Sequence, residues 1–163
     1  MPYFAVALAR KASGWTGQEV DLDDFEDLDG VTELLRDMIV DGGGPALMML
    51  EENDEYMLAV RVDGDGDPRS FISDVRAVET SELAAKFYDL TIPEIILEDE
   101  DEDSAARPEG EPGGDESIAS DLGTLPAELL DLCAEEGNLP ADVIYAVCEA
   151  AGCAQVLEDL RGA

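Results

Sequence analysis

Three apolar runs separated by two turns make up residues 46–75, ALMMLEENDEYMLAVRVDGDGDPRSFISDV. The runs are of strand length and occupy residues 46–50, 56–62 and 70–75. The first turn contains Asn53 and Asp54, and the second covers residues 63–68. Asn, Asp, Gly and Pro favour such reversals because they tolerate or preset the backbone angles that a tight turn needs. The stretch therefore predicts a β-hairpin followed by a third strand.

Two further strands and a helix are predicted upstream of this stretch. Residues 3–9 form an apolar run of strand length, and residues 15–20 follow it after a Ser-Gly turn signal. The next apolar residues recur at the spacing of one helix face, and they are Val31, Leu34, Leu35, Met38 and Ile39. Asp29 is the expected N-cap of this helix, and the sequence Gly42-Gly43-Gly44-Pro45 is expected to end it.

A second helix is predicted downstream, with Thr80 as its cap and Leu83, Ala84, Phe87 and Tyr88 as its apolar residues. The order is then two strands, a helix, three strands and a helix. This order predicts the α+β class, with an antiparallel sheet that carries helices on one face.

The charge along the chain divides it into three parts. Residues 93–116 carry 11 acids and 1 base, including an unbroken acidic run at 98–103, and several Pro and Gly follow that run. Such a segment cannot bury enough apolar surface to offset its ordering entropy. We therefore expect an α+β domain at 1–92, an acidic disordered linker at 93–120 and a small helical segment at 121–163.

The C-terminal segment predicts three helices from a short internal echo. Leu125-Pro126 recurs as Leu139-Pro140, each time behind a capping residue, Thr124 or Asn138, with an acid in the first turn. Gly137 and Gly152 are expected to end the first two helices, and residues 153–160 form the third. About 40 residues is the lower limit for an independent fold. The segment is expected to dock on the first domain, on a second copy or on a partner.

Composition excludes several functions. The chain has 41 Asp+Glu against 9 Lys+Arg and a net charge of -32, which opposes direct binding to nucleic acid or to an anionic membrane surface. Partners with basic surfaces are the complement of such a charge. The chain has no His, so no Ser-His-Asp or Cys-His catalytic pair and no His-containing zinc or iron site can form. We assign no catalytic, cofactor-binding or metal-ligating residue from the sequence and expect a protein that is not an enzyme.

The three cysteines and the N-terminus indicate a cytoplasmic protein. Cys133, Cys148 and Cys153 form no CxxC motif, and an odd number of thiols is typical of a reducing compartment. Cys148 and Cys153 are five residues apart, and a helix end is expected to separate them. The apolar run near the N-terminus precedes its basic pair Arg10-Lys11, which is the reverse of a signal peptide.

Two motifs resemble ligand sites. Asp63, Asp65, Asp67 and Asp74 resemble part of a calcium loop, but Pro68 stands where that loop needs glycine. An Asp- and Gly-rich hairpin turn explains the same residues. The glycines at 42–44 are of the kind that cradles a phosphate, but they follow a helix and precede a strand, so a helix stop explains them better.

Three further features have a functional and a structural interpretation. The acidic run at 98–103 either binds a basic partner specifically or serves only as a solvated linker. Trp15, beside Arg10 and Lys11, either anchors a partner or covers the sheet. Cys148 lies on an apolar helix stripe with Ile144 and Val147, which indicates a buried thiol.

Several segments together resemble a known family. They are MPYFAVALAR at 1–10, Gly14-Trp15, VDLDD at 20–24, Glu55-Tyr56, VRVDGD at 60–65 and DPRSFISD at 67–74. This order resembles the tRNA adenosine deaminase-associated protein family of actinobacteria over residues 1–88, and the acidic linker and helical tail also fit. The family's name reflects association with the deaminase gene rather than a known activity, so the resemblance supplies no functional residues.

The residues bear on what the resemblance implies. Zinc deaminases that act on bases hold zinc through one His and two Cys or through three Cys, within an H-x-E…P-C-x-x-C signature, which this chain lacks. The resemblance therefore implies an accessory protein that binds tRNA adenosine deaminase by direct protein-protein contact and does not bind the tRNA. Two alternatives remain. One is a stand-alone domain that binds a small ligand or a divalent metal through the four aspartates. The other is a phosphate mimic that occupies the basic groove of another nucleic-acid-binding protein through the acidic run at 98–103.

Overall fold

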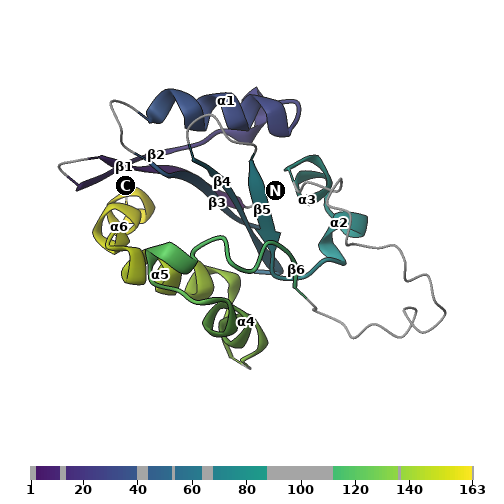
Figure 1. Cartoon of the computed structure of the whole chain (residues 1–163). Coiled ribbons are helices and arrows are strands. Elements are labelled where there is room, and N and C mark those ends of the chain that lie inside the picture. Colours follow the sequence, from purple (N-terminus) through teal and green to yellow (C-terminus); the bar gives the residue numbers. More distant parts are fainter. Residues whose placement is uncertain are drawn as a thin grey trace.

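A six-stranded antiparallel sheet forms the centre of the protein in the computed structural model, with helices on both faces (Figure 1). The structure describes residues 3–11, 14–39, 44–52, 54–63, 68–87, 112–135 and 137–162. The strand order is β2-β1-β3-β4-β5-β6. The α+β class with an antiparallel sheet is therefore confirmed.

The strands follow the apolar runs of the sequence. Their bounds are Tyr3–Lys11 (β1), Gly14–Glu19 (β2), Ala46–Glu52 (β3), Tyr56–Val62 (β4), Arg69–Ile72 (β5) and Gly113–Gly114 (β6). The helices are Leu28–Met38 (α1), Ala77–Thr80 (α2), Glu82–Phe87 (α3), Pro126–Ala134 (α4), Pro140–Ala151 (α5) and Ala154–Gly162 (α6), with short 3-10 helices at Leu22–Asp24 (η1) and Ser120–Leu122 (η4). The third predicted strand ends at Ile72 because the chain then turns into α2.

The first face of the sheet is covered by α1, α2 and α3. Alternate strand residues such as Ala7, Met48 and Leu58 point to this face, because successive side chains of a strand point to opposite sides. They pack with Leu35 of α1 and Phe87 of α3 in what we call the first core.

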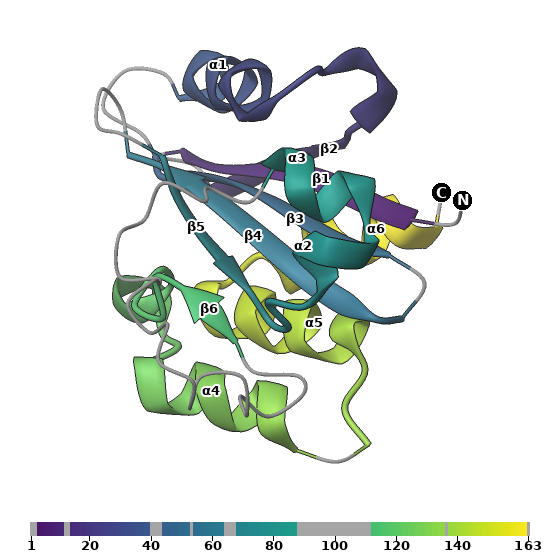
Figure 2. The same cartoon turned by 90° about the vertical axis from the view of Figure 1, so that its right-hand side faces the viewer.

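The second face is covered by α4, α5 and α6, which lie on the other side of the sheet from α1 (Figures 1 and 2). The intervening strand residues, such as Leu8, Met49 and Phe71, pack here with Ile144 of α5 and Leu157 of α6 in what we call the second core. The C-terminal helices therefore dock in cis on the N-terminal part of the chain.

The expected caps of α1 and α3 were each misplaced by one or two residues. Asp27, not Asp29, is the N-cap of α1, and its Oδ1 accepts a hydrogen bond from the Gly30 N–H (3.3 Å). The earlier start places Leu28 in the helix, where it packs against the first core. Thr80 is the last residue of α2, and the Ser81 Oγ accepts from the Ala84 N–H (3.1 Å) at the start of α3.

The caps expected for α4 and α5 were also wrong. Leu125 and Leu139 occupy the N-cap positions, so Thr124 and Asn138 lie one residue too early. The acids in the first turn make the cap instead. Glu128 accepts from the Leu125 N–H and Asp142 from the Leu139 N–H, both at 3.0 Å.

Part of the segment expected to be a disordered linker, 93–120, is folded. Residues 93–111 lie outside the described residues, as does Tyr88. From Pro112 onward, β6 pairs with β5, and Ile118 and Ala119 are buried in the second core. The linker was predicted from the charge of the segment, and that charge count took no account of the apolar side chains at 118–119.

Candidate functional site

The aspartates considered for a metal site are not brought together. Asp65 and Asp67 lie outside the described residues. Asp63 follows β4 and Asp74 follows β5, and because these strands are antiparallel the two residues lie at opposite ends of the hairpin. Within the described ranges, no group of three His, Cys, Asp or Glu residues is placed to hold a metal ion.

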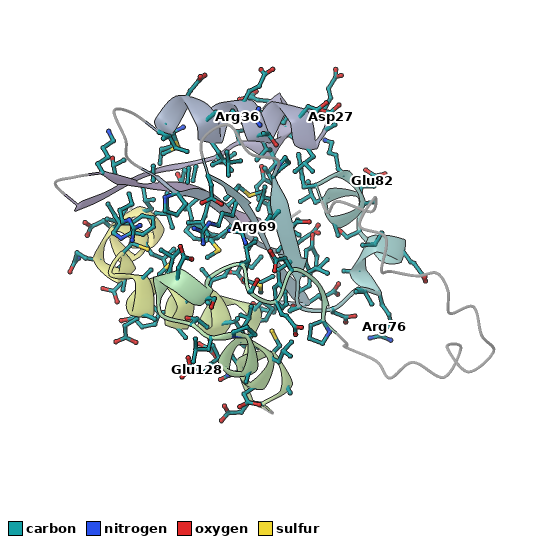
Figure 3. All side chains as sticks on the ribbon, viewed as in Figure 1. Asp27, Arg36, Arg69, Arg76, Glu82 and Glu128 are labelled. Atoms are coloured by element: carbon teal, nitrogen blue, oxygen red, sulfur yellow. The ribbon has the colours of Figure 1, made fainter. Side chains whose placement is uncertain are left out.

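Arginines neutralise the two described aspartates. The Asp63 carboxylate accepts from Arg61 (2.9 Å) and Arg69 (3.0 Å). Asp74 pairs with Arg76 (3.4 Å), and Figure 3 shows Arg76 beside α2, well separated from Arg69 on the sheet. Within the part of the chain that the structure describes, the aspartates do not favour the small-ligand or metal alternative.

The remaining sequence candidates have structural roles or lie outside the described residues. Gly42, Gly43 and the acidic run at 98–103 are not described, and Gly44 leads into β3 rather than into a helix. The Trp15 Nε1–H donates to the Ala151 carbonyl (3.1 Å), so this tryptophan covers the second face and contacts α5. Cys148 is buried, as its apolar stripe predicted.

A buried arginine joins the sheet to the C-terminal segment. The Arg61 side chain is 4% exposed and lies on the second face. Its guanidinium donates to both carboxylate oxygens of Asp121 (2.7 and 2.9 Å) and to the Ile118 carbonyl (2.7 Å). Arg69 extends this network to Asp115 (3.1 Å). We call these residues the arginine junction. They hold η4 and the strand β6 against β4 and β5.

The arginine junction changes the acidity of Asp121. The hydrogen bond from Arg61 is the main cause that lowers the Asp121 pKa from 3.8 to about 2, because it stabilises the ionised carboxylate. Arg61 was not among the residues predicted from the sequence to be functional. The signal was a charge inside the apolar run YMLAVRV, which has to be paired if both faces of the strand are buried.

An open groove lies at the end of the β4–β5 hairpin that is opposite the arginine junction. A depression of about 170 Å³ lies between the β3–β4 turn, the end of β5 and the α4–α5 connection. It adjoins a wider depression of about 450 Å³ that reaches α2, and the two share Glu55 and Asp74. We call this surface the acidic groove. Its lining residues are Asp54, Glu55, Ser73, Asp74, Arg76, Ala77, Glu79, Cys133, Asn138, Leu139, Pro140 and Val143.

The acidic groove combines negative charge with an exposed apolar side chain. Asp54, Glu55 and Glu79 are exposed acids, and Arg76 is the one base among the described lining residues. Leu139 stands at the rim with 48% of its surface exposed, although its neighbour Val143 is buried. This combination complements a surface that presents basic side chains around an apolar one.

The acidic groove forms only when the C-terminal helices dock on the sheet, so no local sequence pattern predicts it. Asp54 and Glu55 come from a hairpin turn in which Asp54 adopts a left-handed backbone (φ 59°). Leu139 and Pro140 come from a helix start more than 80 residues further along the chain. The two parts meet only because the C-terminal helices cover the second face.

Fold and groove together define an acidic α+β protein with a concave, negatively charged surface. Within the described residues, no helix is long and apolar enough to cross a membrane. A sequence model of the Rv3753c-like tRNA adenosine deaminase-associated protein family matches residues 3–154. The chain belongs to this family, which confirms the resemblance and extends it through α4 and α5. The family is described as associated with the deaminase and not as a deaminase. Searches of the curated proteins and of the solved structures each gave no match.

Proposed function

We propose that this protein is a non-enzymatic accessory protein that binds tRNA adenosine deaminase by direct protein-protein contact. The observation that carries the proposal is membership of a family named for association with that enzyme. The composition supports it, because a chain with no His and no CxxC motif lacks the zinc-binding signature of the base deaminases.

Charge favours contact with protein over contact with tRNA. A net charge of -32 repels the phosphate backbone, so the protein does not bind tRNA by itself. An enzyme that binds tRNA needs basic side chains for the phosphates, and an acidic accessory protein complements such a surface. The acidic groove offers both shape and charge for that contact. Three cysteines that are not joined in disulfides fit a cytoplasmic setting for this association.

The test is a binding measurement between the two purified proteins at low and moderate salt. We expect saturable binding that weakens as salt rises, because ions screen the attraction between exposed charges. An absence of binding even at low salt would refute the accessory role.

Charge reversal locates the contact. The double variant Asp54→Lys/Glu55→Lys reverses two exposed acids of the groove, and Glu33→Lys/Asp37→Lys makes the same charge change on the exposed side of α1. We expect the groove variant to lose at least about tenfold more affinity than the α1 variant, which corresponds to about 1.4 kcal/mol. Equal losses would mean that net charge rather than the groove drives binding. Loss of binding on deletion of residues 98–103, with the groove variant unaffected, would place the contact in the acidic run.

A further inference from the structure

The C-terminal end of α5 brings two cysteines together. Gly152 adopts a left-handed backbone (φ 96°), and its N–H donates to the Glu149 carbonyl (3.3 Å). The Cys153 N–H donates to the Cys148 carbonyl (2.8 Å). These two bonds form a Schellman motif, in which the side chains at the positions held here by Cys148 and Cys153 usually touch.

The backbone geometry brings the two residues within disulfide range. An α-carbon lies about 2.4 Å from its own carbonyl oxygen and about 1.5 Å from its own nitrogen. With a hydrogen bond of 2.8 Å between Cys153 N and Cys148 O, the two α-carbons are at most about 6.7 Å apart. Disulfides span α-carbon separations of about 4.4–6.8 Å. The helix end that was expected to separate these cysteines therefore brings them together.

The two thiols also contact each other. The Cys148 thiol donates a hydrogen bond to the Cys153 sulfur, and this bond lowers the pKa of Cys153 in spite of its burial. Both side chains are buried in the second core, with 1% and 3% of their surfaces exposed. The thiolate is the form that reacts with peroxides and disulfides, so the hydrogen bond favours reaction at Cys153 once local opening at the end of α5 admits a peroxide.

We propose that Cys148 and Cys153 form an intramolecular disulfide when a hydroperoxide oxidises the protein. The Cys153 thiolate attacks the peroxide, the O–O bond breaks, and a sulfenic acid forms with loss of one molecule of water or alcohol. The Cys148 thiolate then attacks the Cys153 sulfur and displaces the hydroxyl as a second water. In total two S–H bonds are lost, one S–S bond forms, and the two electrons given up by the sulfurs reduce the peroxide.

The disulfide fastens the corner between α5 and α6. Ala151 in this corner accepts the Trp15 hydrogen bond, and Leu157 of α6 lies in the second core. A covalent bond across this corner fixes the start of α6 relative to the last turn of α5.

Cys133 provides an internal control in the same chain. It lies on α4, it lines the acidic groove, and burial raises its pKa to about 11. With its thiol protonated at neutral pH, Cys133 reacts slowly with peroxide and stays open to alkylation after denaturation.

The experiment treats the reduced full-length protein with hydrogen peroxide, then denatures it and alkylates the remaining thiols for intact-mass analysis. We expect one alkylated cysteine, Cys133, and a protein mass lower by about 2 Da for the two hydrogens lost. The variant Cys133→Ser is expected to show the same mass loss and no alkylation. Peptide mapping should place the bond between residues 148 and 153.

Cys148→Ala and Cys153→Ala should each abolish the intramolecular bond, with circular dichroism used to confirm that they fold. Because Cys133→Ser keeps both partners, the test holds even if the alanine variants fail to fold. Three alkylated cysteines after peroxide treatment, a bond that includes Cys133, or a disulfide between two molecules would each overturn the proposal.

Discussion

Replacing Arg61 with alanine should loosen the attachment of the C-terminal segment to the sheet. The guanidinium is buried and reaches Asp121, Asp63 and the Ile118 carbonyl at 2.7–2.9 Å. Alanine removes all of these contacts at once. It also removes the aliphatic stem of the arginine, which packs on the second face.

The size of the effect follows from what remains unpaired. Asp121 and Asp63 have side chains 62% and 42% exposed, so water replaces the arginine there at little cost. The buried Ile118 carbonyl has no such replacement, which costs about 1–3 kcal/mol. With the loss of stem packing, we expect Arg61→Ala to lower the free energy of unfolding by about 2–4 kcal/mol.

The assay is denaturant unfolding followed by circular dichroism and by Trp15 fluorescence. Trp15 is the only tryptophan and is hydrogen-bonded to α5, so its emission reports the docking of the C-terminal helices. Arg69→Ala is the matched control, because Arg69 binds Asp63 and Asp115 but is 37% exposed, and its loss should cost less than about 1 kcal/mol. If Arg61→Ala is no more destabilising than Arg69→Ala, the argument from burial fails.

Two further predictions test the arginine junction and the turn after η4. Because the folded-state pKa of Asp121 is depressed to about 2, its contribution is complete above about pH 4 and is lost as the pH falls toward 2. The difference in unfolding free energy between wild type and Asp121→Asn should therefore shrink over that interval in urea titrations; a constant difference would contradict the pairing. Gly123→Ala should be more destabilising than Gly137→Ala in thermal unfolding, since both glycines have positive φ but a Cβ at Gly123 would lie 2.8 Å from the Ala150 carbonyl oxygen. Equal losses of stability in the two variants would show that the backbone near Ala150 moves aside without a cost in free energy.

The strands were predictable because their runs are continuous and their turns are marked by Asp, Gly, Pro and Asn. The same runs held information that the prediction of helices on one face did not use. In residues 3–9 and 46–50 apolar side chains occupy consecutive positions, whereas a strand with one solvated face alternates. Consecutive apolar positions indicate that both faces are covered, and the C-terminal helices supply the second cover.

The helix caps were less predictable because the sequence offers several equivalent residues. Aspartates stand at 21, 23, 24, 27 and 29, and each is a good N-cap by type. Packing of Leu28 against the first core decided the choice, and packing is not visible in a local pattern. The possible metal site was also inferred from local spacing. Spacing alone does not show that Asp63 and Asp74 lie at opposite ends of a hairpin.

The two-sided covering of the sheet has a consequence for synthesis of the protein. The strands of the N-terminal part leave the ribosome first, and at roughly 5–20 residues per second the chain from Phe87 to Leu157 takes roughly 4 to 14 s to complete. During that interval the side chains of Leu8, Met49 and Phe71 have no helices to cover them. Residues 1–92 carry 21 acids against 7 bases, so nascent chains on neighbouring ribosomes repel one another while this face is bare. The acidity of the N-terminal part thus opposes contact between half-made sheets before their C-terminal helices are synthesised.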